Sequence, residues 1–318
     1  MARDFFKKSN PGFTGVSGTI VSDIQRTLNA LSGGNIQVDG IYGGQTVTAL
    51  SAFQSGRQLP ATGAVSDATW SALMNTPEPP IFERCLEVVA SFEGTGFTLV
   101  VGNFDGAGVT WGIIGFTLKG GELGTVLARI NQLYPGLMAQ AFGHDTETIL
   151  RITSDATSDA KKIEWADSVS RGPTKYNVAE PWRTYFHNLG TYPEVQRIQI
   201  ERAREVYWRI ATRDCNDLSM SDELDYLLMY DVAVQNGGMR SKNRLQNARA
   251  AFQQQNPSTS KAKRAIVAKV VTDSITSQYK NDVQRRKTTI ATGTGVVHGG
   301  KYDLSAWGFL NGKSPTSI

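Results

Sequence analysis

The sequence of 318 residues is poor in cysteine and histidine and has no long hydrophobic run. Its two cysteines, Cys85 and Cys215, are too few for a disulfide framework and are typical of a protein made in a reducing compartment. The three histidines are scattered without metal-ligand spacing, and no His-Glu-x-x-His sequence occurs, which disfavours a zinc hydrolase. No stretch reaches the roughly 18 apolar residues of a membrane span, and no signal peptide follows the first methionine. We therefore expect a soluble, non-exported chain that needs no metal or organic cofactor.

Charge is close to balanced over the whole chain but differs between its parts. The chain has 33 basic and 29 acidic residues, for a net charge of +4. Residues 240–318 hold 14 basic and 3 acidic residues, whereas residues 81–239 hold 14 basic and 21 acidic ones. The basic segment lacks interleaved aromatic residues and any helix-turn-helix or zinc-finger pattern, so we expect no nucleic-acid partner. Its positive charge suits steering toward an anionic polymer.

The first 75 residues contain two similar half-units. Asp39-Gly40 and Thr46 recur 23 residues later as Thr62-Gly63 and Thr69. Each half-unit is typical of a glycine turn followed by a short helix, and an amphipathic helix with apolar residues between positions 21 and 31 precedes them. The repeat predicts a small all-α domain over residues 1–75. Three prolines within residues 76–80 then predict a stiff, extended linker.

Residues 81–318 predict a second, larger domain that is mainly α-helical. A helix begins at Ile81 and ends at the glycines after Glu93. Residues 97–116 are β-branched, aromatic and rich in glycine, which predicts strands joined by turns and is the only strong β signal in the chain. Further helical patterns follow near residues 123–130, 195–212, 222–236, 240–255 and 260–285. The expected fold class is therefore mainly α, with one small β-sheet in the larger domain.

Two carboxylates stand where a helix end and a turn can present them. Glu93 ends the first helix of the larger domain, and Asp105 lies twelve residues later at a turn of the expected sheet. Cleavage of a glycosidic bond uses such a pair, because one protonated carboxyl group donates to the leaving oxygen while an ionised one activates water. Apolar neighbours such as Phe92 would keep one group protonated, and polar neighbours such as Asn103 would keep the other ionised. The alternative is a solvated glutamate and an ordinary Asp-Gly turn.

Glu93 and the segment Asp105-Gly-Ala-Gly-Val-Thr-Trp-Gly-Ile-Ile-Gly-Phe116 resemble the catalytic signature of the family 46 glycoside hydrolases, the chitosanases of the lysozyme-like superfamily. The resemblance implies a lysozyme-like α+β fold in which Glu93 is the general acid and Asp105 the general base. It also implies that Thr110 positions the attacking water and that Glu122 binds sugar.

A weaker resemblance extends to Tyr230-Asp231 and to Arg286. In the family the aspartate of the Tyr-Asp helix pairs, behind the substrate cleft, with an arginine near the end of the chain. The resemblance therefore implies that Asp231 pairs with Arg286 or its neighbour Arg285. Together with Glu122 and Trp111, this pair completes the expected substrate-binding set. A salt bridge that only fixes helices together is the alternative for Asp231.

Residues 24–73 resemble the three-helix peptidoglycan-binding domains of cell-wall hydrolases. The resemblance rests on Ile24-Gln25, on Val38-Asp39-Gly40-Ile41-Tyr42-Gly43 and on Thr69-Trp70. It implies peptidoglycan as a partner. The polar candidates for contact with the wall are Asp39, Tyr42, Gln45 and Gln54.

Together these features predict a modular, endolysin-type hydrolase that cuts β-1,4 bonds of the cell-wall glycan, as a muramidase or lysozyme does. By analogy with the chitosanases we expect inversion, which needs carboxyl groups about 6.5–9.5 Å apart. The alternatives are a chitosanase acting on β-1,4-linked glucosamine, which the acidic middle of the chain favours, and a non-catalytic wall-binding protein.

The expected setting is that of a phage lysis protein. We expect a monomer that accumulates in the host cytoplasm without stable membrane insertion and acts on the wall in the periplasm. A bacterial toxin delivered by a secretion machine is the neighbouring alternative.

Overall fold

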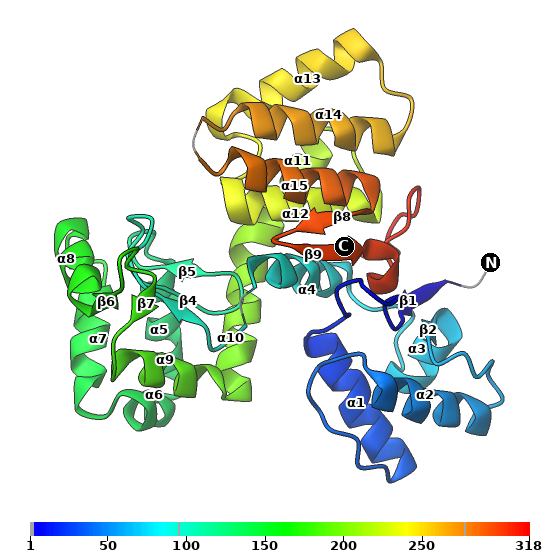
Figure 1. The fold of residues 1–318 in the computed structure, drawn as a ribbon, viewed down its shortest axis with the longest axis horizontal. Helices are drawn as coiled ribbons and strands as arrows, with labels where there is room; N and C mark the ends of the chain where they lie inside the picture. The colour runs from blue at the N-terminus through cyan, green and yellow to red at the C-terminus, as the bar shows by residue number, and fades with distance from the viewer. Residues whose placement is uncertain (1–2, 95, 277) are drawn as a thin grey trace. The chain divides into compact units, whose positions relative to one another are not determined.

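The computed structural model describes residues 3–94, 96–276 and 278–318 (Figure 1). The chain forms two compact units: residues 1–92 with 207–318, here called unit 1, and residues 93–206, here called unit 2. Helices dominate both units and all strands are short, which confirms the mainly α fold class. Among the residues described, no helix is long and apolar enough to cross a membrane.

Unit 1 begins with a small helical domain built from α1 (Thr19–Ser32), α2 (Gly44–Gly56) and α3 (Asp67–Met74). These are the three helices that the sequence predicts. The amphipathic face of α1 is buried, with Ile24 and Leu28 fully inaccessible. A short strand that the sequence pattern does not predict, β1 (Asp4–Phe6), pairs antiparallel with β2 (Val65–Ser66).

Two glutamines explain the repeat of the half-units. In the first half-unit, the amide of Gln25 donates to Thr46 Oγ1 (3.0 Å) and its oxygen accepts from the Gly40 N–H (2.9 Å). In the second half-unit, Gln54 makes the matching bonds to Thr69 Oγ1 (3.0 Å) and the Gly63 N–H (2.9 Å). Each glutamine therefore ties a glycine turn to the helix that follows it. Both glycines have a positive φ, which side-chain-bearing residues rarely adopt.

The proline-rich segment after α3 is held from several sides. Trp70 donates to Thr76 Oγ1 (2.9 Å), and the carboxylate of Glu78 accepts from the Thr316 N–H (2.7 Å) and lies 3.8 Å from the Arg3 guanidinium. No boundary between compact units falls within residues 76–80. The small domain thus belongs to unit 1, together with the helix that follows the prolines.

A buried carboxylate joins the small domain to α4 (Ile81–Glu93). Glu87 of α4 is 3% exposed and accepts from the Ile20 N–H (2.6 Å) in the first turn of α1. The residue before α1 is Gly18, which has no side chain to cap the helix, and a Cβ there would lie 2.3 Å from Glu87 Cδ. Glu87 therefore supplies from another domain the acceptor that a capping side chain normally provides.

The largest part of unit 1 is organised around α12 (Glu223–Asn236), in which eleven of fourteen residues are buried. It packs against α11 (Arg209–Asp217), α14 (Ser260–Asp273) and α15 (Lys280–Thr292), and α13 (Arg244–Gln255) packs on α14 (Figure 1). The helices expected near 222–236 and 240–255 are confirmed. The single helix expected over 260–285 is wrong, because the chain turns between α14 and α15 so that both can pack on α12.

The last elements of unit 1 are a hairpin and a short helix. β8 (Thr294–Val297) and β9 (Gly300–Asp303) are antiparallel, and the 3₁₀ helix η4 (Leu304–Trp307) follows. The sequence pattern does not predict this hairpin, since glycines and polar residues interrupt the apolar alternation of its strands, Thr-Gly-Val-Val and Gly-Lys-Tyr-Asp. Cys85 and Cys215 are free and buried in unit 1, as the low cysteine count predicts.

Unit 2 contains the sheet that the sequence predicts. Strands β3 (Val100–Val101), β4 (Thr110–Trp111) and β5 (Phe116–Thr117) form an antiparallel sheet in that order. A second hairpin, β6 (Ser170–Arg171) with β7 (Asn177–Val178), contacts β3. Gln199 fixes the sheet to a helix, because its side chain accepts from the Ile113 N–H (3.0 Å) and donates to the Phe97 carbonyl (3.2 Å).

Helices make up the rest of unit 2. They are α5 (Glu122–Leu133), α6 (Pro135–Phe142), α7 (Thr146–Thr153), α8 (Asp159–Val169), α9 (Trp182–Gly190) and α10 (Pro193–Ala203). A π-helical turn, Arg204–Trp208, follows α10 in the chain. The continuous helix expected near 195–212 is thus α10, this turn and the start of α11.

Candidate active site

The two expected catalytic carboxylates stand at the positions that their local sequence predicts. Glu93 is the last residue of α4 and is half-buried, and Gly94 follows it with a φ of 62°, which ends the helix. Asp105 is exposed in the loop between β3 and β4. Its Oδ1 accepts from the Ala107 N–H (3.0 Å), which leaves the carboxylate otherwise open to solvent. Thr110, the expected water-positioning residue, is half-buried in β4 opposite Thr117.

The loop that carries Asp105 is tied down by its neighbour Asn103. The side-chain oxygen of Asn103 accepts from the Gly108 N–H (2.9 Å), which closes the loop across its base. Its amide donates to Asp167 Oδ1 (2.7 Å), and its backbone N–H donates to Ser170 Oγ (2.9 Å). Asn103 is itself buried. The Asp105 carboxylate is therefore presented from a rigid turn.

The expected pair of Asp231 and Arg286 is confirmed in unit 1. Arg286 Nε lies 3.1 Å from Asp231 Oδ1, and Lys287 also donates to the Asp231 carboxylate. Burial alone would raise the pKa of Asp231, but the two cations outweigh it and hold that pKa below its usual value. The Arg286 guanidinium lies over the Phe92 ring, 5.6 Å from its centroid, so the cluster borders the residue that precedes Glu93.

The interpretation of these residues as direct sugar ligands needs correction. Asp231 and Arg286 are 0% and 1% exposed, so they support α4 and do not reach a surface. Trp111 is also completely buried, and its indole N–H donates to the Phe186 carbonyl (3.1 Å). Trp111 is a core residue of unit 2, because its strand packs this side chain against α9. Resemblance in sequence located these residues but did not show which way they face.

Glu122 already has a strong partner. Arg202 donates to both of its oxygens, from Nε (2.7 Å) and Nη2 (3.1 Å). Hydrogen bonding to Glu122, aided by its charge, raises the pKa of Arg202. This bidentate pair joins α5 to α10, and the sequence could not predict it because its members lie 80 residues apart.

A histidine network borders the same helix end. His298 Nδ1 lies 2.8 Å from the Phe92 carbonyl oxygen, and its Nε2 lies 2.6 Å from Asp282. Asp282 in turn accepts from Gln235 (2.7 Å), whose side-chain oxygen accepts from Lys287 (2.7 Å). Asp282, Gln235 and Lys287 were not singled out in the sequence. The four-residue spacing of Asp231 and Gln235 on one helix was the sequence signal that could have placed Gln235 beside Asp231.

Three of the four expected wall-contacting residues are structural. Gln54 is fully buried, and Tyr42 is 3% exposed and donates to the Gly63 carbonyl (3.0 Å). Asp39 accepts from Gln25 (2.8 Å) and from the Ile41 N–H (2.8 Å), which shapes its turn. Gln45 is exposed. The expectation that Tyr42 and Gln54 touch the wall is therefore wrong, since their polar atoms are used inside the domain.

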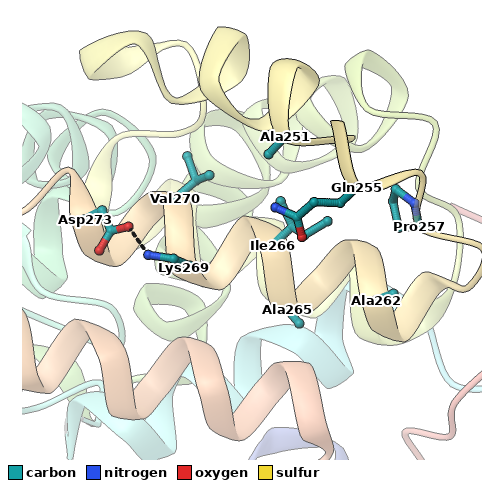
Figure 2. Close-up of a pocket in the computed structure, with 9 residues that line it drawn as sticks. All are labelled: Ala251, Gln255, Pro257, Ala262, Ala265, Ile266, Lys269, Val270 and Asp273. Atoms are coloured by element: carbon teal, nitrogen blue, oxygen red, sulfur yellow. Dashed lines mark hydrogen bonds and ion pairs between the residues drawn. The ribbon is translucent and has the colours of Figure 1, made fainter. Parts of the chain in front are cut away.

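Two hollows among the described residues lie away from the expected catalytic residues. A groove of about 460 Å³ between α13 and α14 is lined mainly by alanine and aliphatic side chains, with one ion pair, Lys269 to Asp273 (2.6 Å) (Figure 2). In unit 2, a hollow of about 490 Å³ lies between β3 and α9, with His187 and Arg183 on its wall. Neither offers a carboxylate pair in contact with an open sugar-sized surface.

Comparison with known proteins agrees with this fold. Residues 17–73 match a family of peptidoglycan-binding domains, and residues 93–289 match glycosyl hydrolase family 46. No curated protein matches the chain. The two matches define a glycoside hydrolase of β-1,4 bonds with an added peptidoglycan-binding domain. Because the second match covers more than half of the chain, the chain belongs to glycosyl hydrolase family 46.

Solved chitosanases share the fold. A Gynuella sunshinyii family 46 chitosanase in complex with chitotetraose is 14% identical with a TM-score of 0.51, over 71% of this chain and 98% of that one. A native Bacillus subtilis chitosanase is 15% identical with a TM-score of 0.51, over 70% of this chain and 97% of that one. At such identities the likeness establishes the fold.

Proposed function

We propose that this glycoside hydrolase is an endolysin-type enzyme that cuts β-1,4 bonds in the glycan of peptidoglycan. The observation that carries the proposal is the peptidoglycan-binding domain, which is joined to α4 through Glu87. A binding domain raises the local concentration of its polymer at the active site by tethering. A domain attached to the helix that ends in Glu93 would deliver wall glycan to that carboxylate.

In the proposed mechanism the two carboxylates divide the work. Glu93 donates a proton to the leaving glycosidic oxygen, and Asp105 removes a proton from the water that attacks the anomeric carbon. The Thr110 hydroxyl positions this water. The mechanism inverts the anomeric configuration and requires the two carboxyl groups to stand about 6.5–9.5 Å apart. The exposed position of Asp105 on a rigid turn supports its role as the base.

Hydrolysis of chitosan is the second candidate, and the fold shared with solved chitosanases favours it. A polycationic substrate would be attracted by an acidic surface. However, several of the acidic residues that give residues 81–239 their negative charge are buried in ion pairs. Glu223 pairs with Arg84 and Arg3, and Asp225 pairs with Arg264. Unit 2 itself has 13 acidic and 11 basic residues. The charge of the surface therefore supports chitosan less than the sequence suggested.

The proposed setting is phage-induced lysis, in which the enzyme accumulates in the host cytoplasm and reaches the wall in the periplasm. The pairing of a wall-binding domain with a glycosidase domain supports this setting. A delivered bacterial toxin would have the same two domains.

Mass spectrometry of soluble products tests the proposal. Purified sacculi and, separately, chitosan are incubated with the wild type, with Glu93→Gln and with Asp105→Asn. A matched control is Glu164→Gln, which changes an exposed carboxylate of α8. We expect muropeptides with a new reducing N-acetylmuramic acid end from sacculi, from the wild type and the control only. All variants should still bind sacculi in a pull-down assay.

Two results would contradict the proposal. Release of products from chitosan alone would replace peptidoglycan by chitosan as substrate. Binding of sacculi without products from either polymer would favour a non-catalytic wall-binding protein.

A further inference from the structure

Two aromatic side chains of unit 2 lie side by side in solvent. Phe104 and Tyr176 are 42% and 47% exposed, and their ring centroids are 5.5 Å apart with planes inclined at 53°. They come from the β3–β4 loop and from the β6–β7 hairpin, 72 positions apart in the chain. Leaving two adjoining rings half exposed forgoes favourable burial of apolar area. Adjoining exposed apolar groups on a polar surface are typical of a binding site.

The frame beneath these rings is rigid. The Gly102 N–H donates to the Tyr176 carbonyl (2.7 Å), which joins the two loops directly. A Cβ at Gly102 would lie 2.4 Å from the Lys175 carbonyl oxygen, so only glycine allows this approach. Asp167 then accepts from both loops, from Lys175 Nζ (2.8 Å) and from the Asn103 amide (2.7 Å). Hydrogen bonds from Lys175 and then Asn103 lower the pKa of Asp167, which keeps this link charged.

The position of the rings indicates what they bind. Phe104 directly precedes Asp105, and adjacent Cα atoms are about 3.8 Å apart. Any glycan that places a scissile bond at Asp105 must therefore pass close to Phe104. The rings are flanked by polar groups of Asp167, Lys175 and Asn177. A pyranose ring matches this mixed surface, because it has an apolar C–H face and a rim of hydroxyl groups.

We propose that Phe104 and Tyr176 form a stacking platform for a pyranose ring of a β-1,4-linked glycan, next to the bond that Asp105 helps to cleave. This inference rests on the proposed function and adds a binding subsite to it. The platform holds the strand without taking part in the chemistry. Its contribution is therefore equal in the ground state and the transition state and lowers KM without changing kcat.

Substitutions that remove or keep each ring test the platform. Tyr176→Ala and Phe104→Ala remove a ring, whereas Tyr176→Phe and Phe104→Tyr keep it. Leu133→Ala is the control for loss of an exposed apolar side chain elsewhere in unit 2, since Leu133 is 52% exposed. Kinetics are measured on a soluble β-1,4 glucosamine hexamer and its N-acetylated form, and on the corresponding trimers. Binding of the hexamers is measured by calorimetry in the Glu93→Gln background.

The expected result is a rise of about tenfold in KM and Kd for the hexamer in each alanine variant, which corresponds to about 1.4 kcal/mol. The kcat value should stay within about twofold of wild type. The trimers should show a similar rise in KM, because a substrate with its scissile bond at Asp105 also passes the platform beside that residue. The ring-keeping variants and Leu133→Ala should match the wild type.

Several results would overturn the platform. Unchanged KM and Kd in Tyr176→Ala, with a normally active enzyme, would leave the proposed function standing and remove the subsite. A fall in kcat with unchanged KM would show that the substitution disturbed Asp105. An effect confined to sacculi that carry stem peptides would assign the rings to peptide. If the wild type cleaves no glycan, the proposed function fails, and hexamer binding alone then decides whether the platform exists.

Discussion

The link between the small domain and α4 leads to a prediction about stability and pH. Glu87 is buried, and its Oε1 accepts from the Ile20 N–H while its Oε2 has no hydrogen-bond partner. Burial raises its pKa to about 8, with smaller contributions from the charges of Glu83 and Asp23. The hydrogen bonds from Ile20 and Thr19 oppose this rise without cancelling it. At neutral pH the folded protein therefore holds a proton that the unfolded chain would release.

The magnitude follows from the difference between the two pKa values. The unfolded value is about 4.5, so the difference is about 3.5, at about 1.4 kcal/mol for each pH unit. Because the folded pKa is the higher one, this contribution to stability is complete below pH 4.5 and is lost as pH rises to 8. The free energy of unfolding should therefore fall by about 5 kcal/mol over this range through Glu87 alone.

Glu87→Gln should remove this dependence. Glutamine keeps the oxygen that accepts from the Ile20 N–H but cannot ionise. We expect the variant to equal the wild type near pH 4.5 and to exceed its stability at pH 8. Guanidinium unfolding at several pH values measures the difference, and hydrogen exchange of the α1 amides assigns it to this contact. Glu83→Gln, the same change one helical turn earlier, should keep most of the wild-type pH dependence.

One outcome would refute the reasoning about Glu87. If Glu87→Gln is less stable than the wild type at pH 8, the ionised carboxylate is the form that caps α1. Attraction between the negative charge and the helix N-terminus would then exceed the cost of burying that charge.

Three further changes have distinct expected results. Asp231→Asn leaves Arg286 and Lys287 buried without their anion and should lower the unfolding free energy by about 3–5 kcal/mol in calorimetry. Asp273→Asn breaks an exposed pair with Lys269 and should lower it by less than about 1 kcal/mol. Gln54→Ala removes three hydrogen bonds and should destabilise the small domain by about 2–4 kcal/mol in thermal melts. The control Gln45→Ala, at an exposed position, should have no effect. Equal melting temperatures for the two variants would show that the domain does not depend on the hydrogen bonds of Gln54. Gly102→Ala should displace the β6–β7 hairpin and speed proteolysis near residues 172–176. Gly96→Ala should not, because a Cβ there meets no neighbour. Equal cleavage rates would argue against the close approach of Gly102 to the Lys175 carbonyl.

Local patterns predicted the small sheet and the helices of the small domain and of residues 207–255, but they did not predict α6, α7, α8 and α9. The ends of α4 and α1, the turn at Asp105 and the short strands around it depend on glycine, apolar spacing and β-branched residues that are close in sequence. The single helix over 260–285 failed because its break is set by packing on α12. The β8–β9 hairpin was missed because glycines and polar residues interrupt the apolar alternation of its strands.

The candidate site was predictable to a different degree. The positions of Glu93 and Asp105 at a helix end and a loop follow from local sequence, and the pairing of Asp231 with Arg286 follows from family resemblance. The direction in which a side chain faces does not. Trp111 and Gln54 were expected to contact substrate or wall, yet both are buried, and their polar atoms have partners inside the fold.

The sequence by itself determined the family and the small helical domain and predicted two candidate carboxylates, because each of these depends on residues that lie near one another along the chain. Only the tertiary structure decided the contacts between distant segments. Glu122 meets Arg202, Glu87 caps α1, and Phe104 lies beside Tyr176. Such pairs depend on how helices and loops pack against one another. Packing depends on residues far apart in the chain, so it cannot be predicted from a local sequence pattern.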